Sequence, residues 1–189
     1  MSKYHDITDF IRPNGRLDYV RVRRFAEKES VMRFEEIFQR PLFVGSGIAS
    51  GQLEGGSESG QTMLFNVKSL KQVVESEMDD SLQTAIFALH KRNRGDGKPN
   101  IITVGRSNDN DLVMNDYPIS REHAMIRIQA GRYYLMDNNA TNGTTINEQP
   151  LSPRKEMEIK LGDKVGFGRY RFYFLGAKAL YKRIQTQGK

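Results

Sequence analysis

Three short clusters of polar residues have the types and the spacing to bind an anion. They are Thr103-Val104-Gly105-Arg106, Ser120-Arg121-Glu122-His123 and Thr141-Asn142-Gly143-Thr144. Each cluster lies in or beside a turn between strand-like runs, and loops on a rigid sheet are where binding residues concentrate. Together the clusters offer a guanidinium fork, small hydroxyls, a carboxamide and a glycine, which suit an oxyanion.

The same clusters lack the arrangement that a catalytic site needs. Ser120 and His123 have the residue types of a nucleophile and its base. However, no nucleophile elbow surrounds Ser120, and the sequence specifies no carboxylate that would orient His123. We therefore expect a site that holds its ligand without transforming it, and a protein that is not an enzyme.

The order of the clusters resembles the forkhead-associated (FHA) domain, a phosphothreonine-binding β-sandwich. The motifs of that family are Gly-Arg, Ser-x-x-His and Asn-Gly-Thr, and this chain has them at 105–106, 120–123 and 142–144. The resemblance covers about residues 84–176. A single such motif would mean little, because Asn-Gly alone is a common hairpin turn. Three motifs in this order indicate the family.

The resemblance also implies a role for each site residue. Arg106 and Ser120 would bind the phosphate, and Thr141 would support them from the neighbouring loop. Asn142 would bond the backbone of the phosphopeptide. Arg121 matches a variable position that often lies near the phosphate. The residues expected to be architectural are Gly105, His123 and Gly143.

The chemistry of the ligand fits these residue types. A phosphothreonine carries a charge of about −1.5 to −2 and three strong acceptor oxygens. Arginine meets two such oxygens with one planar fork, which lysine cannot do. Hydrogen bonds to charged groups contribute about 1.5–3 kcal/mol each, and a micromolar complex needs about 8 kcal/mol in total. We therefore expect moderate affinity that depends on the phosphate.

The implied partner is a phosphothreonine-containing protein, either a substrate of a Ser/Thr kinase or the kinase itself, and the chain would act as a signalling adaptor. The threonine methyl group would favour phosphothreonine over phosphoserine. Residues 108–111 and 117–119 are expected to add specificity. No cofactor is expected. Asp109, Asp111 and Asp116 miss the spacing of a calcium loop, and the histidines have no ligand spacing, so no metal is expected.

Two other functions stay open. One is a phosphate-independent scaffold subunit, held mainly by a helix near 28–39. The lesser one is a basic nucleic-acid-binding protein, because the net charge is +6 and the pI is about 9.5. The densest cationic stretches, 21–24 and 91–98, lack the interleaved aromatic residues of a single-strand platform.

Short runs of alternating apolar residues from residue 85 onward predict an all-β fold, an antiparallel β-sandwich. Residues 85–89 and 101–104 are predicted to form its opening hairpin, across a long turn. The further predicted strands are 112–114, 124–129, 133–136, 157–161, 165–167 and 172–175.

The flanking segments read differently. Residues 17–25 are ambiguous between strand and helix, whereas apolar spacing predicts helices over 28–39 and 66–78. Residues 45–60 are rich in glycine and serine and predict a flexible loop, and 177–185 predict a short basic helix. The expected domains are a helical extension with that loop over 1–80, an FHA domain over 84–176 and a helical tail over 177–189.

Composition indicates the expected compartment. The chain has no cysteine, which excludes disulfides and thiolate metal sites. No apolar run approaches the length of a membrane span, and the polar N-terminus lacks the apolar core of a secretion signal. We expect a cytoplasmic protein without a membrane partner.

Overall fold

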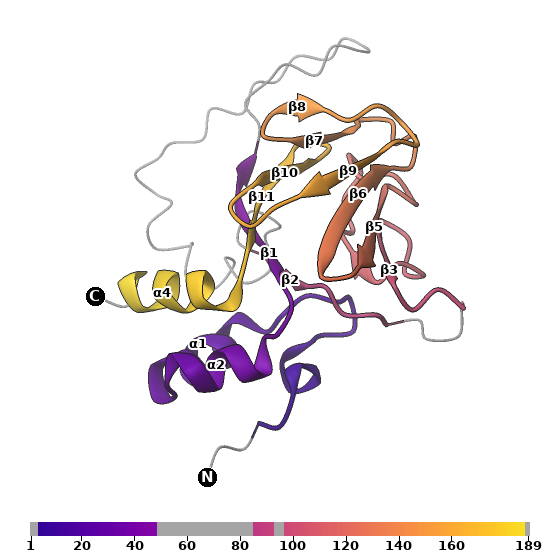
Figure 1. Ribbon diagram of the computed structural model, residues 1–189. Coiled ribbons are helices and arrows are strands. Elements are labelled where there is room, and N and C mark those ends of the chain that lie inside the picture. Colours follow the sequence, from indigo (N-terminus) through magenta and orange to yellow (C-terminus); the bar gives the residue numbers. More distant parts are fainter. Residues whose placement is uncertain (1–3, 49–84, 93–96, 188–189) are drawn as a thin grey trace, which may run out of the picture.

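The chain folds into two β-sheets packed face to face, with α-helices gathered beside one of them (Figure 1). The computed structural model describes residues 4–48, 85–92 and 97–187. The predicted antiparallel β-sandwich with an N-terminal helical extension and a short C-terminal helix is confirmed. No helix among these residues is both long and apolar enough to cross a membrane.

The two sheets differ in how they are built from the chain. Their strands are β1 (Leu42–Ile48), β2 (Ile86–Ala88), β3 (Ile101–Gly105), β4 (Leu112–Val113), β5 (Ala124–Gln129), β6 (Arg132–Asp137), β7 (Thr144–Ile146), β8 (Gln149–Pro150), β9 (Glu156–Ile159), β10 (Lys164–Phe167) and β11 (Tyr170–Leu175). The first sheet has the order β2-β1-β11-β10-β7-β8, and the second has the order β4-β3-β5-β6-β9. Neighbours are antiparallel, except that the short β3–β4 pair is parallel.

Aromatic side chains fill the space between the sheets. Phe172 and Phe174 on β11 are fully buried and alternate with half-buried residues, as the two-residue period of a strand requires. Phe43, Phe87 and Phe167 join them from the neighbouring strands of the same sheet. The rings of Phe43 and Phe174 lie 5.3 Å apart between centroids. This core fixes the strands whose ends carry the loops.

A second core lies on the other side of β1 and β2, under the helices (Figure 1). Its elements are the 3₁₀ helix η1 (Ile7–Phe10), α1 (Tyr19–Lys28), α2 (Val31–Ile37) and α4 (Ala177–Gln187). On β1, Phe43 is part of the sandwich core, while Leu42 and Val44 are part of the helical core. The strand is thus buried on both faces, which explains its continuous apolar run.

The helix predicted over 28–39 is shorter in the structure, where α2 covers residues 31–37 and a separate helix, α1, ends at residue 28. Asp18 caps α1 by accepting a hydrogen bond from the backbone of Arg21 at 3.1 Å, and Ser30 caps α2 by accepting one from Arg33 at 3.3 Å. The ambiguous segment 17–25 is therefore mostly helical. Small polar side chains at the N-caps determine where each helix begins, which apolar spacing alone does not reveal.

Two predictions about the start of the sandwich are wrong. Residues 85–89 and 101–104 do not form a hairpin, because β2 pairs with β1 in one sheet and β3 pairs with β4 and β5 in the other. The predicted flexible loop over 45–60 is also wrong at its beginning, since β1 continues to residue 48. Alternation identifies strands but not their partners.

The remaining part of that loop, 49–60, and the predicted helix over 66–78 lie outside the described residues. The division into domains at residues 80 and 84 stays a prediction. The first sheet nevertheless includes β1, which belongs to the segment assigned to the N-terminal extension.

Candidate anion-binding site

The polar clusters meet at one end of the sandwich, where backbone hydrogen bonds join their loops. The N–H of Arg106 donates to the carbonyl of Ser120 at 2.9 Å. The N–H of Thr141 donates to the hydroxyl of Ser120 at 3.1 Å. Loops that follow β3, precede β5 and connect β6 to β7 thus form one surface. The structure brings together the predicted phosphate-binding residues and their predicted support.

The guanidinium of Arg106 is held by one edge. Its Nε donates to the carbonyl oxygen of Ile119 at 3.1 Å. Among the described residues, neither Nη nitrogen has a hydrogen-bond partner, and the side chain is half-buried. No carboxylate pairs with it in that part of the chain. The fork of Nη1 and Nη2 is therefore oriented by the protein and available to an anion.

Ser120 and Asn142 keep hydrogen-bonding capacity in the same way. The Ser120 oxygen accepts from Thr141, so its own O–H remains a donor. Asn142 donates through Nδ2 to the carbonyl of Pro118 at 2.9 Å, which fixes the carboxamide and leaves its oxygen as an acceptor. Thr141 and Asn142 are exposed. These groups can meet a phosphate and a peptide backbone respectively.

His123 joins two of the loops from a buried position inside the sandwich. It is 0% exposed, its Nδ1 accepts from the N–H of Ser120 at 3.1 Å, and its Nε2 lies 3.0 Å from the carbonyl of Gly143. Since Nδ1 accepts, the proton belongs on Nε2, which donates to Gly143. Burial lowers the pKa of His123, although the Gly143 bond and the charge of Asp137 oppose the shift. The ring is a neutral brace.

Two glycines permit this geometry. A Cβ at Gly105 would lie 2.2 Å from the carbonyl oxygen of Arg121 and 2.7 Å from Nδ2 of Asn110. Gly143 has a φ of +65°, which favours glycine.

The side chain of Arg121 is exposed and has no hydrogen bond or ion pair among the described residues. Its backbone carbonyl holds Asn110, and its side chain is exposed beside Ser120.

Sequence reasoning missed the buried polar residues that hold the loops. Asn110, 5% exposed, donates through Nδ2 to the carbonyls of Ser107 at 2.9 Å and Arg121 at 2.7 Å. Asp111, 0% exposed, accepts from Lys91 Nζ at 3.0 Å and from the N–H of Thr103 at 2.9 Å. In the sequence, the only sign of these two residues' roles is that they lie in a run of turn-forming residues.

This burial corrects the prediction for residues 108–111. Asn110 and Asp111 cannot present their side chains to a peptide, because both are committed to loop carbonyls and to buried donors. The segment supports the loop that carries Arg106 and does not read the ligand through these two residues.

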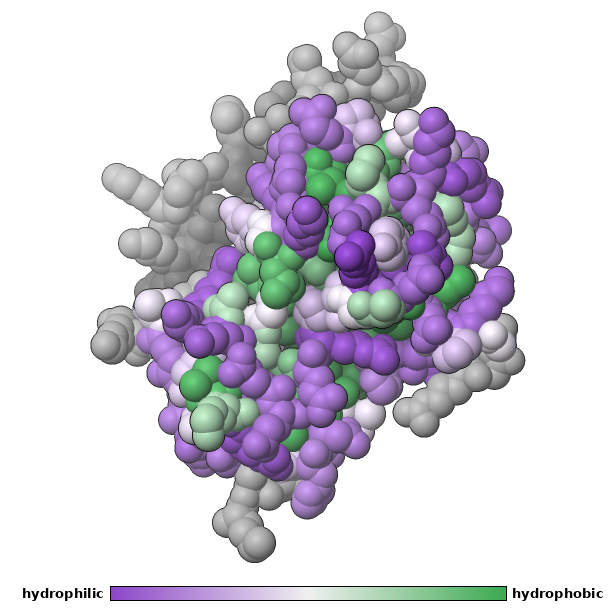
Figure 2. All heavy atoms as spheres, viewed as in Figure 1, coloured by the Kyte–Doolittle hydropathy of each residue, from purple (hydrophilic) through white to green (hydrophobic). Residues whose placement is uncertain are grey.

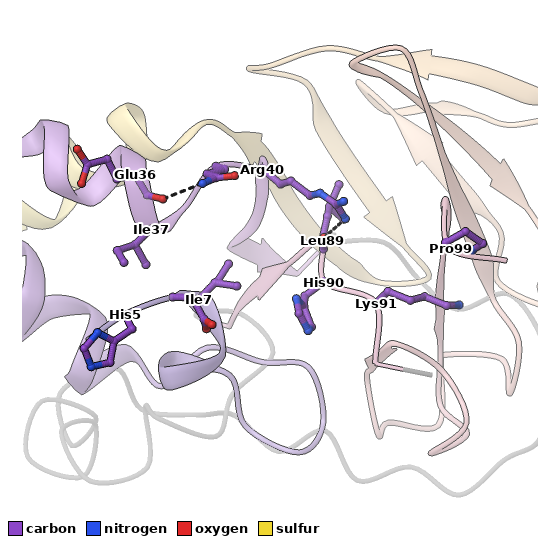
Figure 3. A pocket seen from close by; sticks show the side chains of 11 residues that line it. His5, Ile7, Glu36, Ile37, Arg40, Leu89, His90, Lys91 and Pro99 are labelled. Carbon is purple, nitrogen blue, oxygen red and sulfur yellow. Dashed lines mark hydrogen bonds between the residues drawn. The ribbon is translucent and has the colours of Figure 1, made fainter. Parts of the chain in front are cut away.

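A hollow of about 510 Å³ lies elsewhere, between η1 and α2 on one side and residues 89–91 on the other (Figure 3). Two of its cations are engaged, since Arg40 donates to the carbonyl of Leu89 at 3.2 Å and Lys91 pairs with Asp111 at 3.0 Å. None of the residues from the three clusters lines it. Among the described residues, no cluster of metal-binding side chains occurs either.

Comparison with known families agrees with the geometry. Residues 102–168 match the model of the FHA domain, so this part of the chain is an FHA domain. The match spans the clusters at 103–106, 120–123 and 141–144.

Curated relatives match the chain over part of its length. The chain is 34% identical over 77 residues to the oxoglutarate dehydrogenase inhibitor of Corynebacterium efficiens, which covers 41% of this chain and 52% of that protein. It is 33% identical over 73 residues to the glycogen accumulation regulator GarA of Mycolicibacterium smegmatis, covering 39% and 44%. The chain thus spans about half the length of the curated relatives it matches.

A chain from a structural and functional analysis of phosphothreonine-dependent FHA domain interactions is 26% identical, with a TM-score of 0.41, over 51% of this chain and 88% of that one.

Proposed function

We propose that this protein binds phosphothreonine in partner proteins and acts as a signalling adaptor rather than as an enzyme. One observation carries the proposal: the Nη fork of Arg106 is fixed through Nε and unpaired among the described residues, and its loop is bonded to Ser120. A cationic fork beside a free hydroxyl needs an anion with several oxygens, which a phosphate supplies.

The proposed contacts follow from the groups that remain available. Arg106 binds two phosphate oxygens, and the Ser120 O–H binds a third or shares one of them. Thr141, which is exposed and bonded to Ser120, supports the phosphate from the neighbouring loop. Two or three charge-assisted hydrogen bonds of about 1.5–3 kcal/mol each, reduced by desolvation of the phosphate, account for a dependence on phosphorylation.

Asn142 supplies the peptide contact. Its carboxamide is anchored to the carbonyl of Pro118, so its oxygen and its second N–H stand at a fixed position for a peptide backbone. Pre-organised groups bind with less loss of side-chain entropy. Arg121, exposed beside Ser120, adds long-range attraction for the phosphate. The threonine methyl group adds the preference over phosphoserine.

The names of two relatives, an inhibitor of oxoglutarate dehydrogenase and a regulator of glycogen accumulation, favour a regulatory role. The partner would be a substrate of a Ser/Thr kinase or the kinase itself. A cytoplasmic location is part of the same proposal, and fractionation of cells that express the tagged chain tests it.

The alternative function as a phosphate-independent scaffold is weakened, because the helix face that it needed is not exposed. It depended on the apolar face of the helix near 28–39, but Phe34, Ile37 and Phe38 on that face are buried in the helical core. On the face shown in Figure 2, the surface is mostly hydrophilic, and hydrophobic residues appear as separate groups scattered over it. A phosphate-independent interface of the kind described for obligate assemblies would need a larger apolar area.

The nucleic-acid alternative is weakened by pairing of the cations. Arg23 pairs with Glu27 at 2.8 Å, and Lys91 pairs with the buried Asp111. Both cations belong to the dense stretches at 21–24 and 91–98. Paired charges contribute little to the release of counterions from a phosphate backbone.

The test is fluorescence anisotropy with a degenerate phosphothreonine peptide library, with phosphoserine and unphosphorylated libraries as controls. Arg106→Ala removes the fork, and Arg132→Ala removes an exposed arginine at the opposite end of β6. We expect phosphothreonine-selective binding that Arg106→Ala abolishes and Arg132→Ala preserves. Equal binding of phosphorylated and unphosphorylated peptides, by a folded protein, would refute the proposal.

A further inference from the structure

A fourth loop borders the site, and none of the three motifs includes it. The turn between β10 and β11 contains Gly168, whose N–H donates to the carbonyl of Gly143 at 3.0 Å. A Cβ built on Gly168 would lie 2.8 Å from the carbonyl oxygen of Pro118 and 3.5 Å from the Cβ of Asn142. The turn is therefore packed against both the residue that would bond the peptide and the residue that anchors it.

Arg169, the next residue in this turn, is held in place by one nitrogen. Its Nη2 donates to Oδ2 of Asp116 at 2.7 Å and to the hydroxyl of Tyr170 at 2.9 Å. Its guanidinium carbon lies 5.1 Å from the centre of the Tyr170 ring. The Tyr170 hydroxyl also donates to Asp116. These contacts restrict the rotamers of a side chain that would otherwise be free at a turn.

Asp116, which holds Arg169, accepts hydrogen bonds on both of its carboxylate oxygens. Asp116 accepts from the N–H of Tyr117 at 2.7 Å through Oδ1, in addition to the donors on Oδ2. Burial raises the pKa of Asp116, but the hydrogen bonds from Tyr170, Arg169 and Tyr117 outweigh burial and hold its pKa below the ordinary value. The carboxylate is ionised at neutral pH, and both of its oxygens already accept hydrogen bonds from the protein. We therefore do not expect Asp116 to bind the ligand.

The unused capacity is on the arginine. Among the described residues, Nε and Nη1 of Arg169 have no hydrogen-bond partner, and its side chain is 42% exposed. Arg171, two residues further on, shows the contrast: its Nε donates to Glu148 and its Nη1 to the carbonyl of Gly168. Arg169 follows Gly168 in the turn that packs against Asn142, so its free N–H groups lie on this side of the site. Each of them can donate a charge-assisted hydrogen bond to a carboxylate oxygen.

We infer that Arg169 binds an acidic side chain of the phosphopeptide, in the stretch of peptide that crosses Asn142. This inference rests on the proposed function, because Asn142 places the peptide there only if the phosphothreonine is bound beside it. Tyr117, 90% exposed and adjacent to Asp116, adds a ring surface for the methylene groups of that acidic residue.

The experiment is a scan of one phosphothreonine peptide in which each flanking position is changed in turn from alanine to glutamate. Binding is measured by anisotropy for the wild type, for Arg169→Gln and for Arg132→Gln. Arg132→Gln removes the same charge at the opposite end of β6, so it controls for long-range attraction. Arg106→Ala is included to test the phosphate pocket itself.

We expect glutamate at one position to tighten binding to the wild type by about threefold to fivefold, the range of a half-exposed ion pair. Arg169→Gln should lose this gain, while it still binds the alanine peptide in a phosphate-dependent way, and Arg132→Gln should keep it. Phosphate-dependent binding with no preference for glutamate, or with a preference that Arg169→Gln retains, would overturn the inference alone. Absence of phosphate-dependent binding would overturn the proposed function as well.

Discussion

Replacement of His123 by alanine is expected to weaken both the fold and the site, because this ring joins two loops from a fully buried position. The change removes the acceptor for the N–H of Ser120, which lies 3.1 Å from Nδ1. It also removes the donor to Gly143, 3.0 Å from Nε2. The carbonyl of Gly143 still accepts from the N–H of Gly168 at 3.0 Å, so it is not left without a partner.

The magnitude follows from these contacts. The partly buried N–H of Ser120 would be left without an acceptor, which costs about 1–3 kcal/mol. The cavity left by the imidazole, which is packed edge-on against Phe167 at 5.9 Å between centroids, adds about 2 kcal/mol or more, as other large-to-small core changes do. We expect a total loss of about 3–5 kcal/mol. Since domains are stable by about 5–15 kcal/mol, the variant should fold but unfold easily.

Urea denaturation measures this loss, with the slope of the transition as a check that the unfolded state is unchanged. Phosphopeptide affinity should fall about tenfold in addition, because the Ser120 and Asn142 loops lose their common brace. His5→Ala is the control, since that side chain is exposed, and should change stability by less than about 0.5 kcal/mol. A His123→Ala protein within about 1 kcal/mol of the wild type would refute the role of the brace.

Three further predictions concern the supports of the site. Because the folded pKa of His123 lies below its ordinary value of 6.5, its contribution to stability is full above pH 6.5 and is lost as the pH falls toward the folded pKa; urea midpoints should fall over this range in the wild type, and an equal fall in His123→Ala would contradict the assignment. Gly105→Ala places a Cβ 2.2 Å from the carbonyl oxygen of Arg121, so thermal unfolding should show a loss of about 1–3 kcal/mol. Asp111→Asn breaks the buried pair with Lys91 and should cost about 3–5 kcal/mol in urea unfolding, whereas a neutral result would mean that the pair is dispensable.

The strands of the second sheet followed from the sequence because their burial alternates. Ala124 and Ile126 on β5 are buried, while Met125 and Arg127, which alternate with them, are not, and this is the pattern that the alternation predicts. Which strands pair with each other was harder to predict from the sequence. Strand β2 is too short and too evenly apolar to specify its neighbour, and its partner β1 lies far away in the chain, before residues 49–84.

The glycines of β1 were misleading for a related reason. Gly45 and Gly47 suggested a loop, but Gly45 is buried and pairs with Phe172, and the register shifts between Gly45 and Gly47. Glycine within a strand often marks such an irregularity. Composition alone does not separate a bulged strand from a linker.

The site could be predicted where the motif supplied it and not elsewhere. Spacing placed Arg106, Ser120 and Asn142 on loops, and the structure brings those loops together. The role of Asn110 could not be predicted, because the two carbonyls to which it donates come within reach only when the loops are folded. The role of Arg169 could not be predicted either, since its turn approaches Asn142 through tertiary packing alone.

Strand β1 is buried on both faces and lies between β2 and β11, and this position determines how the protein can be shortened. A fragment that began at residue 84 would lack it. The backbone of β11 would then become an open edge, and the pocket for Phe43 would be empty. Open edges pair with other chains, so such a fragment would tend to associate or aggregate. A minimal binding fragment should therefore retain the N-terminal segment through residue 48.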